Sequence, residues 1–173
     1  MTQELIDLRT SILEGRYDDA LVIIDELEGM SKQATLRTIE SFLVRLLVYL
    51  IKNQIEQRLT NSWIASISDS IIQIAKLNIK DNKTSYYISL HDWQPYLEEA
   101  VERAIRPASV EILNGNLKPK QVSDRIDRNH LSAIAQSLLD LTYSVSAKDL
   151  PAAIDTYLAE LPGGEDWFEV REE

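Results

Sequence analysis

Histidines and carboxylates are the side chains of this sequence that could hold a metal ion. His91 and His130 are the two histidines, and Asp127 lies three positions before His130, so that these two residues can share one helix face. Such a pair is at most half a site, because carboxylate-bridged di-iron bundles need Glu-x-x-His sets with further glutamates. The chain also contains no cysteine that could supply thiolate ligands. We therefore predict no metal and no cofactor.

Catalytic side chains are equally poorly represented. The adjacent carboxylates Glu98-Glu99 and Asp18-Asp19 would project about 100° apart on a helix and cannot share one site. The serines between Ser62 and Ser70 lack a surrounding Gly-x-Ser-x-Gly turn. None of the five glycines forms part of a phosphate-binding loop. We predict no catalytic residue, and the sequence favours a protein that is not an enzyme.

Arg45 is the one charged residue with a functional alternative. It interrupts the apolar run from Phe42 to Ile51, and a desolvated guanidinium needs a carboxylate or carbonyl partner. We expect Arg45 to pair with a nearby acid or to reach the edge of the helix. The alternative is a small-ligand or enzyme-like pocket between helices, formed by Arg45, Tyr49 and Trp63. A deep, polar-lined cavity at Arg45 would favour that pocket.

The spacing of apolar residues predicts an all-α bundle of about seven helices. A seam of residues three and four apart predicts a long central apolar helix over about 32–57: Leu36, Ile39, Leu43, Leu46 and Leu50. Helices over about 3–14 and 18–28 precede it and end at Gly15 and Gly29. Later helices cover about 61–79, 92–106, 119–128, a stripe from Leu131 to Val145, and a last segment ending near Leu161.

Helix-breaking and capping residues mark the ends of several of these helices. Pro107 should break or kink the helix that begins at Asp92. Asn114-Gly115-Asn116 is the clearest break in the chain, and Ser146 with Asp149 has the spacing of a capping box. We expect residues 1–162 to form one helical domain, with 116–162 as additional helices and 163–173 as a loose acidic tail.

The charge distribution limits the partners. The formal net charge is −10, and residues 149–173 contribute eight acids and one base, or −7. That end of the chain would repel phosphate groups and acidic membranes. The single basic cluster, Lys118, Lys120, Arg125 and Arg128, is diluted by two aspartates. The apolar run from Phe42 to Ile51 is too short for a bilayer core of about 30 Å. We expect a soluble, cytoplasmic protein that binds neither nucleic acid nor membrane.

Several short segments resemble a known family in their order and spacing. They are Gly15-Arg16-Tyr17-Asp18, the run from Ile23 to Ser31, Glu40-Ser41 before the apolar helix ending Lys52-Asn53-Gln54, and Arg58-Leu59-Thr60-Asn61-Ser62-Trp63. Over about residues 5–113 the chain resembles domain-of-unknown-function family twenty-nine, which is common in cyanobacteria. The resemblance implies an all-helical fold and no established activity. It also implies a histidine where this chain has Tyr49, and arginines where it has Asn61 and Ile64.

The absence of recognisable chemistry, together with an excess of apolar helix, favours an interaction protein. We predict a non-enzymatic module that binds an unidentified protein partner or regulates it. The long seam would need cover on nearly all sides within one chain. We therefore also predict a homodimer. The alternative function remains the pocket at Arg45, Tyr49 and Trp63.

Overall fold

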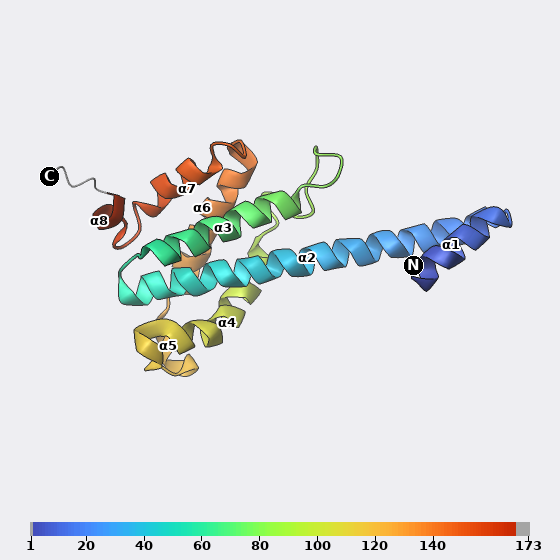
Figure 1. The fold of residues 1–173 in the computed structure, drawn as a ribbon. Coiled ribbons are helices and arrows are strands. Elements are labelled where there is room, and N and C mark those ends of the chain that lie inside the picture. Colours follow the sequence, from blue (N-terminus) through green and yellow to red (C-terminus); the bar gives the residue numbers. More distant parts are fainter. Residues whose placement is uncertain (1, 169–173) are drawn as a thin grey trace. The chain divides into compact units, whose positions relative to one another are not determined.

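The computed structural model describes residues 2–168 and is all-α, as predicted (Figure 1). These residues contain no named strand, and a single isolated bridge joins Ile79 to Tyr86. Eight α-helices and one 3-10 helix follow one another in the described residues: α1 (Gln3–Leu13), α2 (Tyr17–Glu56), α3 (Asn61–Asn78), α4 (Gln94–Glu111), η1 (Ile112–Gly115), α5 (Pro119–Arg125), α6 (Arg128–Ser144), α7 (Leu150–Leu158) and α8 (Gly164–Phe168).

The chain divides into two compact units. The first extends to Thr38 and contains α1 and the beginning of α2, which together form a helical hairpin. The second begins at Ile39 and contains the rest of α2 and all later helices.

The prediction that Gly29 separates two helices is wrong, because α2 runs without interruption from Tyr17 to Glu56. Gly15, in contrast, ends α1 as predicted, with a φ of +74° that favours glycine. A glycine inside a helix, such as Gly29, lowers helix stability by only about 1 kcal/mol relative to alanine, so the residues around Gly29 can keep α2 intact. The buried aliphatic seam of α2 is confined to residues 39–51 in the second unit, and consists of Ile39, Leu43, Leu46, Leu47, Val48, Leu50 and Ile51. The long central apolar helix predicted over 32–57 is therefore not confirmed.

The core of the second unit is aliphatic and draws on several helices. α3 packs on α6 and α7, and α4 packs on α5 and α6, so that the helices after residue 116 lie against those before it. Figure 1 shows α3 alongside the C-terminal half of α2. The largest fully buried side chains include Ile67, Ile71, Ile74, Trp93 and Leu97.

Pro107 does not end α4, which corrects the predicted boundary near Arg106. The helix continues to Glu111 because Ala108, Ser109 and the following Ile112 are all buried, and this packing outweighs the lost donor. The predicted break at 114–116 is present. Leu113, Asn114 and Gly115 all have positive φ angles, and they reverse the chain before α5.

The connection between α3 and α4 is fixed by a buried polar network. The Asn78 side chain donates to the Ile88 carbonyl and accepts from the Ile88 backbone N–H, both at 2.8 Å. The Tyr143 hydroxyl donates to the same carbonyl and accepts from the Trp93 indole at 2.7 Å. The connection therefore packs onto the core, as its apolar residues predict.

In the C-terminal segment, the start of α8 lies very close to the backbone at the end of α7. Gly164 begins α8 and is buried, and a Cβ atom at this position would lie 2.1 Å from the Leu158 carbonyl oxygen. Part of the segment predicted to be a loose tail is therefore helical up to Phe168. Residues 169–173 lie outside the described residues.

Candidate interaction surface

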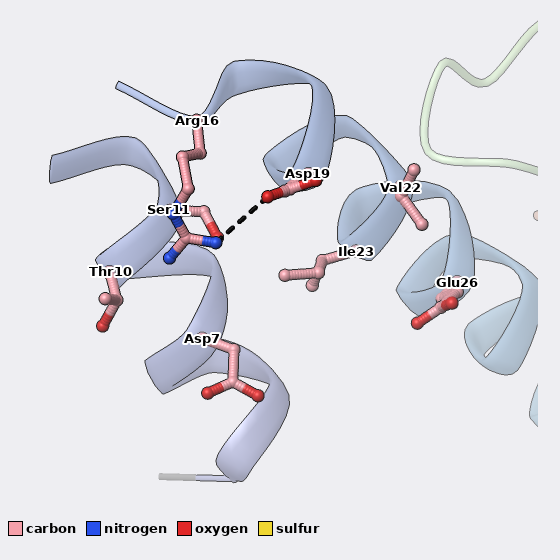
Figure 2. A pocket seen from close by; sticks show the side chains of 8 residues that line it. All are labelled: Asp7, Thr10, Ser11, Arg16, Asp19, Val22, Ile23 and Glu26. Atoms are coloured by element: carbon pink, nitrogen blue, oxygen red, sulfur yellow. Dashed lines mark hydrogen bonds and ion pairs between the residues drawn. The ribbon is translucent and has the colours of Figure 1, made fainter. Parts of the chain in front are cut away.

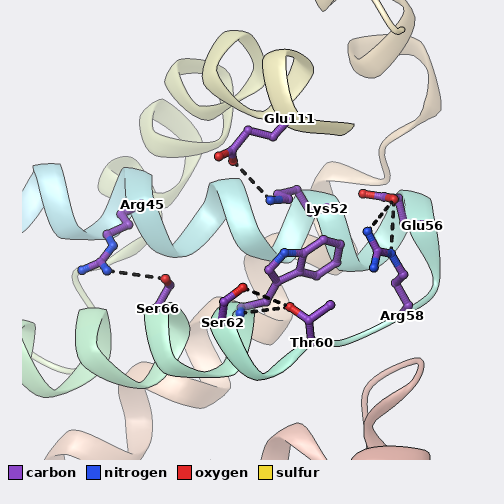
Figure 3. A network of polar contacts seen from close by, with 9 residues as sticks. Arg45, Lys52, Glu56, Arg58, Thr60, Ser62, Ser66 and Glu111 are labelled. Carbon is purple, nitrogen blue, oxygen red and sulfur yellow. Dashed lines mark hydrogen bonds and ion pairs between the residues drawn. The ribbon is translucent and has the colours of Figure 1, made fainter. Parts of the chain in front are cut away.

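Arg45 pairs with an acid, as the preferred interpretation expects. Its Nη1 donates to Asp69 Oδ2 on α3 at 2.8 Å, and Nη2 lies 3.5 Å from the Ser66 hydroxyl, a contact drawn in Figure 3. Both side chains of the ion pair are nearly half exposed. None of five cavities on the described part of the chain, each of about 280–400 Å³, is lined by Arg45, Tyr49 or Trp63. The pocket at these residues stays a prediction.

The structure does bring Tyr49 and Trp63 together, around a lysine that sequence reasoning missed. Lys52 Nζ lies 4.9 Å from the centre of the Tyr49 ring and 4.5 Å from that of Trp63. It also binds Glu111 Oε2 on α4 at 3.2 Å (Figure 3). The lysine side chain is only 8% exposed, and the carboxylate and the two aromatic rings offset the loss of water around its charge.

The turn between α2 and α3 adds a second set of contacts to this cluster. Arg58 donates through Nε and Nη2 to Glu56 Oε1 at 3.3 and 3.2 Å, and its guanidinium lies 4.7 Å from the Trp63 ring. The Thr60 hydroxyl accepts from the Trp63 backbone N–H and caps α3. Asn53 donates to the carbonyls of Arg58 and Pro162 at 3.0 and 2.8 Å. These contacts hold α2, α3, α4 and the segment before α8 together, so the cluster is a structural joint.

The other residues singled out for chemistry also have structural roles. Asp127 caps α6 by accepting from the His130 backbone N–H, which explains their three-residue spacing. Arg128 of the basic cluster forms an ion pair with Glu102 and donates to the Ser123 carbonyl. Within residues 2–168, no group of three or more His, Asp or Glu side chains is placed to hold a metal ion. No helix in this part of the chain combines the length and the apolar character needed to cross a bilayer.

The hairpin of the first unit differs from the rest of the chain in what it exposes. Nine of the thirteen large hydrophobic side chains exposed among the described residues lie between Leu5 and Met30: Leu5, Ile6, Ile12, Leu13, Tyr17, Leu21, Val22, Ile24 and Met30. Only Ser11 and Ala20 of the hairpin are buried, and these small residues allow α1 and α2 to approach closely. Each helix therefore has apolar residues that the other does not cover.

Tyr17, Leu21 and Ile24 follow the four- and three-residue spacing of one helix face on α2. Tyr17 is 65% exposed and Leu21 is 58% exposed. On α1, Leu5 and Ile12 are two turns apart and also share a face. We refer to these five residues as the hairpin surface. Sequence reasoning placed apolar stripes on both helices, but it could not tell which stripes would be left uncovered.

A polar groove lies between α1 and α2 (Figure 2), and none of the five residues of the hairpin surface lines it, because at 100° per residue they lie on the opposite faces of the two helices. Its volume is about 400 Å³, and its walls include the acids Asp7, Asp19 and Glu26 and the aliphatic Val22 and Ile23. Arg16, in the turn between α1 and α2, also lines the groove, and its guanidinium binds Glu14 at 2.8 Å and Asp19 at 3.0 Å. The groove thus combines aliphatic walls with an excess of negative charge.

The described residues thus form an all-α protein in which polar clusters join the helices and the N-terminal hairpin exposes apolar side chains. The family model described as "Domain of unknown function DUF29" matches residues 16–123, and the chain belongs to this family. The match begins at the turn between α1 and α2 and ends within α5. No curated protein and no solved structure matches the chain.

Proposed function

We propose that this protein is a non-enzymatic interaction module whose N-terminal hairpin binds a basic amphipathic helix of a partner protein. The observation that carries the proposal is the concentration of exposed aliphatic side chains between Leu5 and Met30. Contiguous exposed apolar residues are typical of protein-binding surfaces. A helix pair can bury only one face of each helix against the other, so a third helix can add cover to both.

The charge of the hairpin supports a basic partner. Residues 1–38 contain eight acids and four bases, which gives the first unit a formal charge of −4. Arg16 neutralises part of this charge through Glu14 and Asp19, whereas Asp25, Glu26 and Glu28 form no ion pair within the described residues. A partner helix with leucines on one face and lysines beside them would match both the exposed apolar residues and the negative charge of the hairpin.

A second copy of the chain is the competing occupant. Two hairpins could form a four-helix bundle, which is a common architecture for a symmetric dimer. Each copy would then bring its charge of −4 to the same interface, and this repulsion favours a basic partner instead. The predicted homodimer remains testable by sedimentation equilibrium, because a dimer has twice the chain mass of 19.7 kDa.

The test uses the full chain and two synthetic helical peptides of about 18 residues, which are long enough to extend along the hairpin. One peptide has leucines on one face and lysines elsewhere, and the other replaces every lysine by glutamate. Isothermal titration should show saturable one-to-one binding of the lysine peptide and none of the glutamate peptide. Affinity should fall as salt is raised, because the charges across the interface are screened.

A double variant tests whether the hairpin is the binding site. Leu21→Ser with Ile24→Ser removes two exposed aliphatic side chains and should weaken lysine-peptide binding at least about tenfold. The matched control is Val110→Ser on α4, which removes a side chain that is 70% exposed in the second unit and should leave binding unchanged. Equal binding by the double variant and the wild type, or equal binding of both peptides, would contradict the proposal. A mass of twice 19.7 kDa without peptide would favour the second copy as the occupant.

A further inference from the structure

A second apolar surface lies in the other unit, at the ends of α3 and α6. This groove has a volume of about 300 Å³, at the lower end of the range of small-molecule sites. Its walls come from the end of α3, the segment that follows it, the end of α6 and the start of α7: Ile72, Ala75, Lys76, Ile79, Tyr86, Thr142, Val145, Ala147 and Leu150. We refer to it as the α3–α6 groove.

The walls of this groove are held in place by contacts outside it. The Tyr86 ring packs on Tyr143 at a centroid distance of 4.6 Å, and Tyr143 is anchored by its hydrogen bonds to Trp93, Asn78 and Ile88. On the other side, the Ser146 hydroxyl accepts from the Asp149 backbone N–H and fixes the start of α7. A groove fixed in this way does not have to be ordered by its ligand, which lowers the cost of binding.

The lining of the α3–α6 groove is mostly aliphatic, with one cationic side chain. Six of the nine side chains are aliphatic, and the Thr142 hydroxyl already donates to the Leu139 carbonyl at 2.6 Å. Lys76 is the one cationic side chain in the lining, it is exposed, and it forms no ion pair with any residue that the structure describes. An aliphatic groove with an unpaired ammonium at its edge is complementary to a carboxylate that has an aliphatic tail.

We propose that the α3–α6 groove binds an aliphatic monocarboxylate, with the tail against Ile72, Ile79 and Leu150 and the carboxylate on Lys76 Nζ. The acidic hairpin has no part in this site, so the proposal is independent of the proposed function. The net charge of −10 would repel an anion from most of the surface. The unpaired ammonium of Lys76 therefore directs the carboxylate to this groove.

The experiment titrates the full ¹⁵N-labelled chain with octanoate, hexanoate, 1-octanol and octylammonium, and follows backbone amide shifts. Octanoate should bind saturably and shift the amides of Ala75, Ile79 and Val145. Hexanoate should bind about tenfold more weakly, because two buried methylene groups are missing. Octylammonium should bind more weakly than octanoate, because its charge meets that of Lys76.

Two variants complete the test. Lys76→Gln should weaken octanoate binding at least fivefold and leave 1-octanol binding unchanged, whereas Lys120→Gln on α5, with the same loss of charge, should leave both unchanged. Ala75→Leu should fill the groove and abolish the binding of both ligands, with the melting temperature as a check on folding. The proposal is overturned if octanoate does not saturate, if octylammonium binds as tightly as octanoate, or if Lys76→Gln and Lys120→Gln behave alike.

Discussion

Asn78 and Ile88 bind each other through both ends of one side-chain amide, with two hydrogen bonds of 2.8 Å between a helix end and the loop that follows it. The amide takes the place of a strand neighbour for the backbone of Ile88, so the buried N–H and carbonyl of this residue are satisfied without a sheet. Tyr143 supplies a further donor to the same carbonyl. The loop between α3 and α4 is consequently a fixed part of the core.

The Tyr143 hydroxyl should contribute measurably to stability. Tyr143→Phe removes the acceptor of the Trp93 indole N–H and leaves this buried donor unsatisfied, at a cost of about 1–3 kcal/mol. Urea unfolding at neutral pH measures the change in the free energy of unfolding. Tyr17→Phe, at a residue that is 65% exposed, is the control and should change it by less than about 0.5 kcal/mol. Equal effects of the two substitutions would contradict the network.

Leu46 should be one of the most sensitive positions in the chain. Leu46→Ala leaves a cavity in the buried part of α2 and should cost about 2–5 kcal/mol. The control is Leu21→Ala on the same helix, where the side chain is 58% exposed and little should change. The melting temperature and the urea midpoint both report the difference. A loss below about 1 kcal/mol at Leu46 would mean that this part of α2 does not contribute to the core.

Two glycine substitutions should act in opposite directions. Gly29→Ala should stabilise the protein by up to about 1 kcal/mol, because Gly29 lies within α2 and nothing lies within 4 Å of an added Cβ atom. Gly164→Ala should destabilise it, because its Cβ would overlap the Leu158 carbonyl. Differential scanning calorimetry of both variants checks the signs. A stabilising Gly164→Ala would be incompatible with the close approach of α8 to the end of α7.

The ion pair between Glu102 and Arg128 should add a small acid-sensitive contribution to stability. The hydrogen bond from Arg128 is the main cause that lowers the pKa of Glu102 in the folded state. A lowered folded pKa means that the contribution is present above the unfolded value of about 4.3 and is lost as the pH falls through the folded pKa. Its size should be below about 1 kcal/mol, because both side chains are more than 40% exposed.

Glu102→Gln checks this assignment. The free energy of unfolding, measured by urea at several pH values between 3 and 7, should differ between the two proteins near pH 7 and converge as the pH approaches 3. The control is Glu98→Gln, which removes an equal charge one turn away on α4 from a residue that forms no ion pair within the described residues. A constant difference across this range would show that Glu102 titrates normally.

The helical periodicity of single segments could be predicted from the sequence. Which of several glycines and prolines ends a helix could not, because the local sequence around them is similar. Gly15 and Gly29 both follow an apolar stripe, yet only Gly15 has a positive φ angle and ends its helix. Gly29 lies inside a helix that continues into the buried residues from Ile39 onward. Pro107 is a similar case, because the burial of Ala108 and Ile112 keeps α4 intact beyond it.

The candidate sites depend on contacts between distant residues, which explains why the sequence revealed them only in part. Arg45 needs a partner wherever it lies, so its ion pair could be expected even though Asp69 could not be named. Lys52 has its ion-pair partner 59 residues away, at Glu111, and no local pattern links the two. The exposed residues of the hairpin surface have the same spacing as buried ones, and only the packing of α1 on α2 distinguishes them.

The hydrogen bond from Asn53 to the Pro162 carbonyl has a consequence for synthesis of the protein. Asn53 belongs to the family-matched segment 16–123, but its acceptor is 109 residues further along the chain. On the ribosome, the turn between α2 and α3 is therefore made long before the carbonyl that completes it. Until residue 162 has emerged, the Arg58 carbonyl is the only one of the two acceptors available to the Asn53 amide, and the second N–H of this amide has to be satisfied by water.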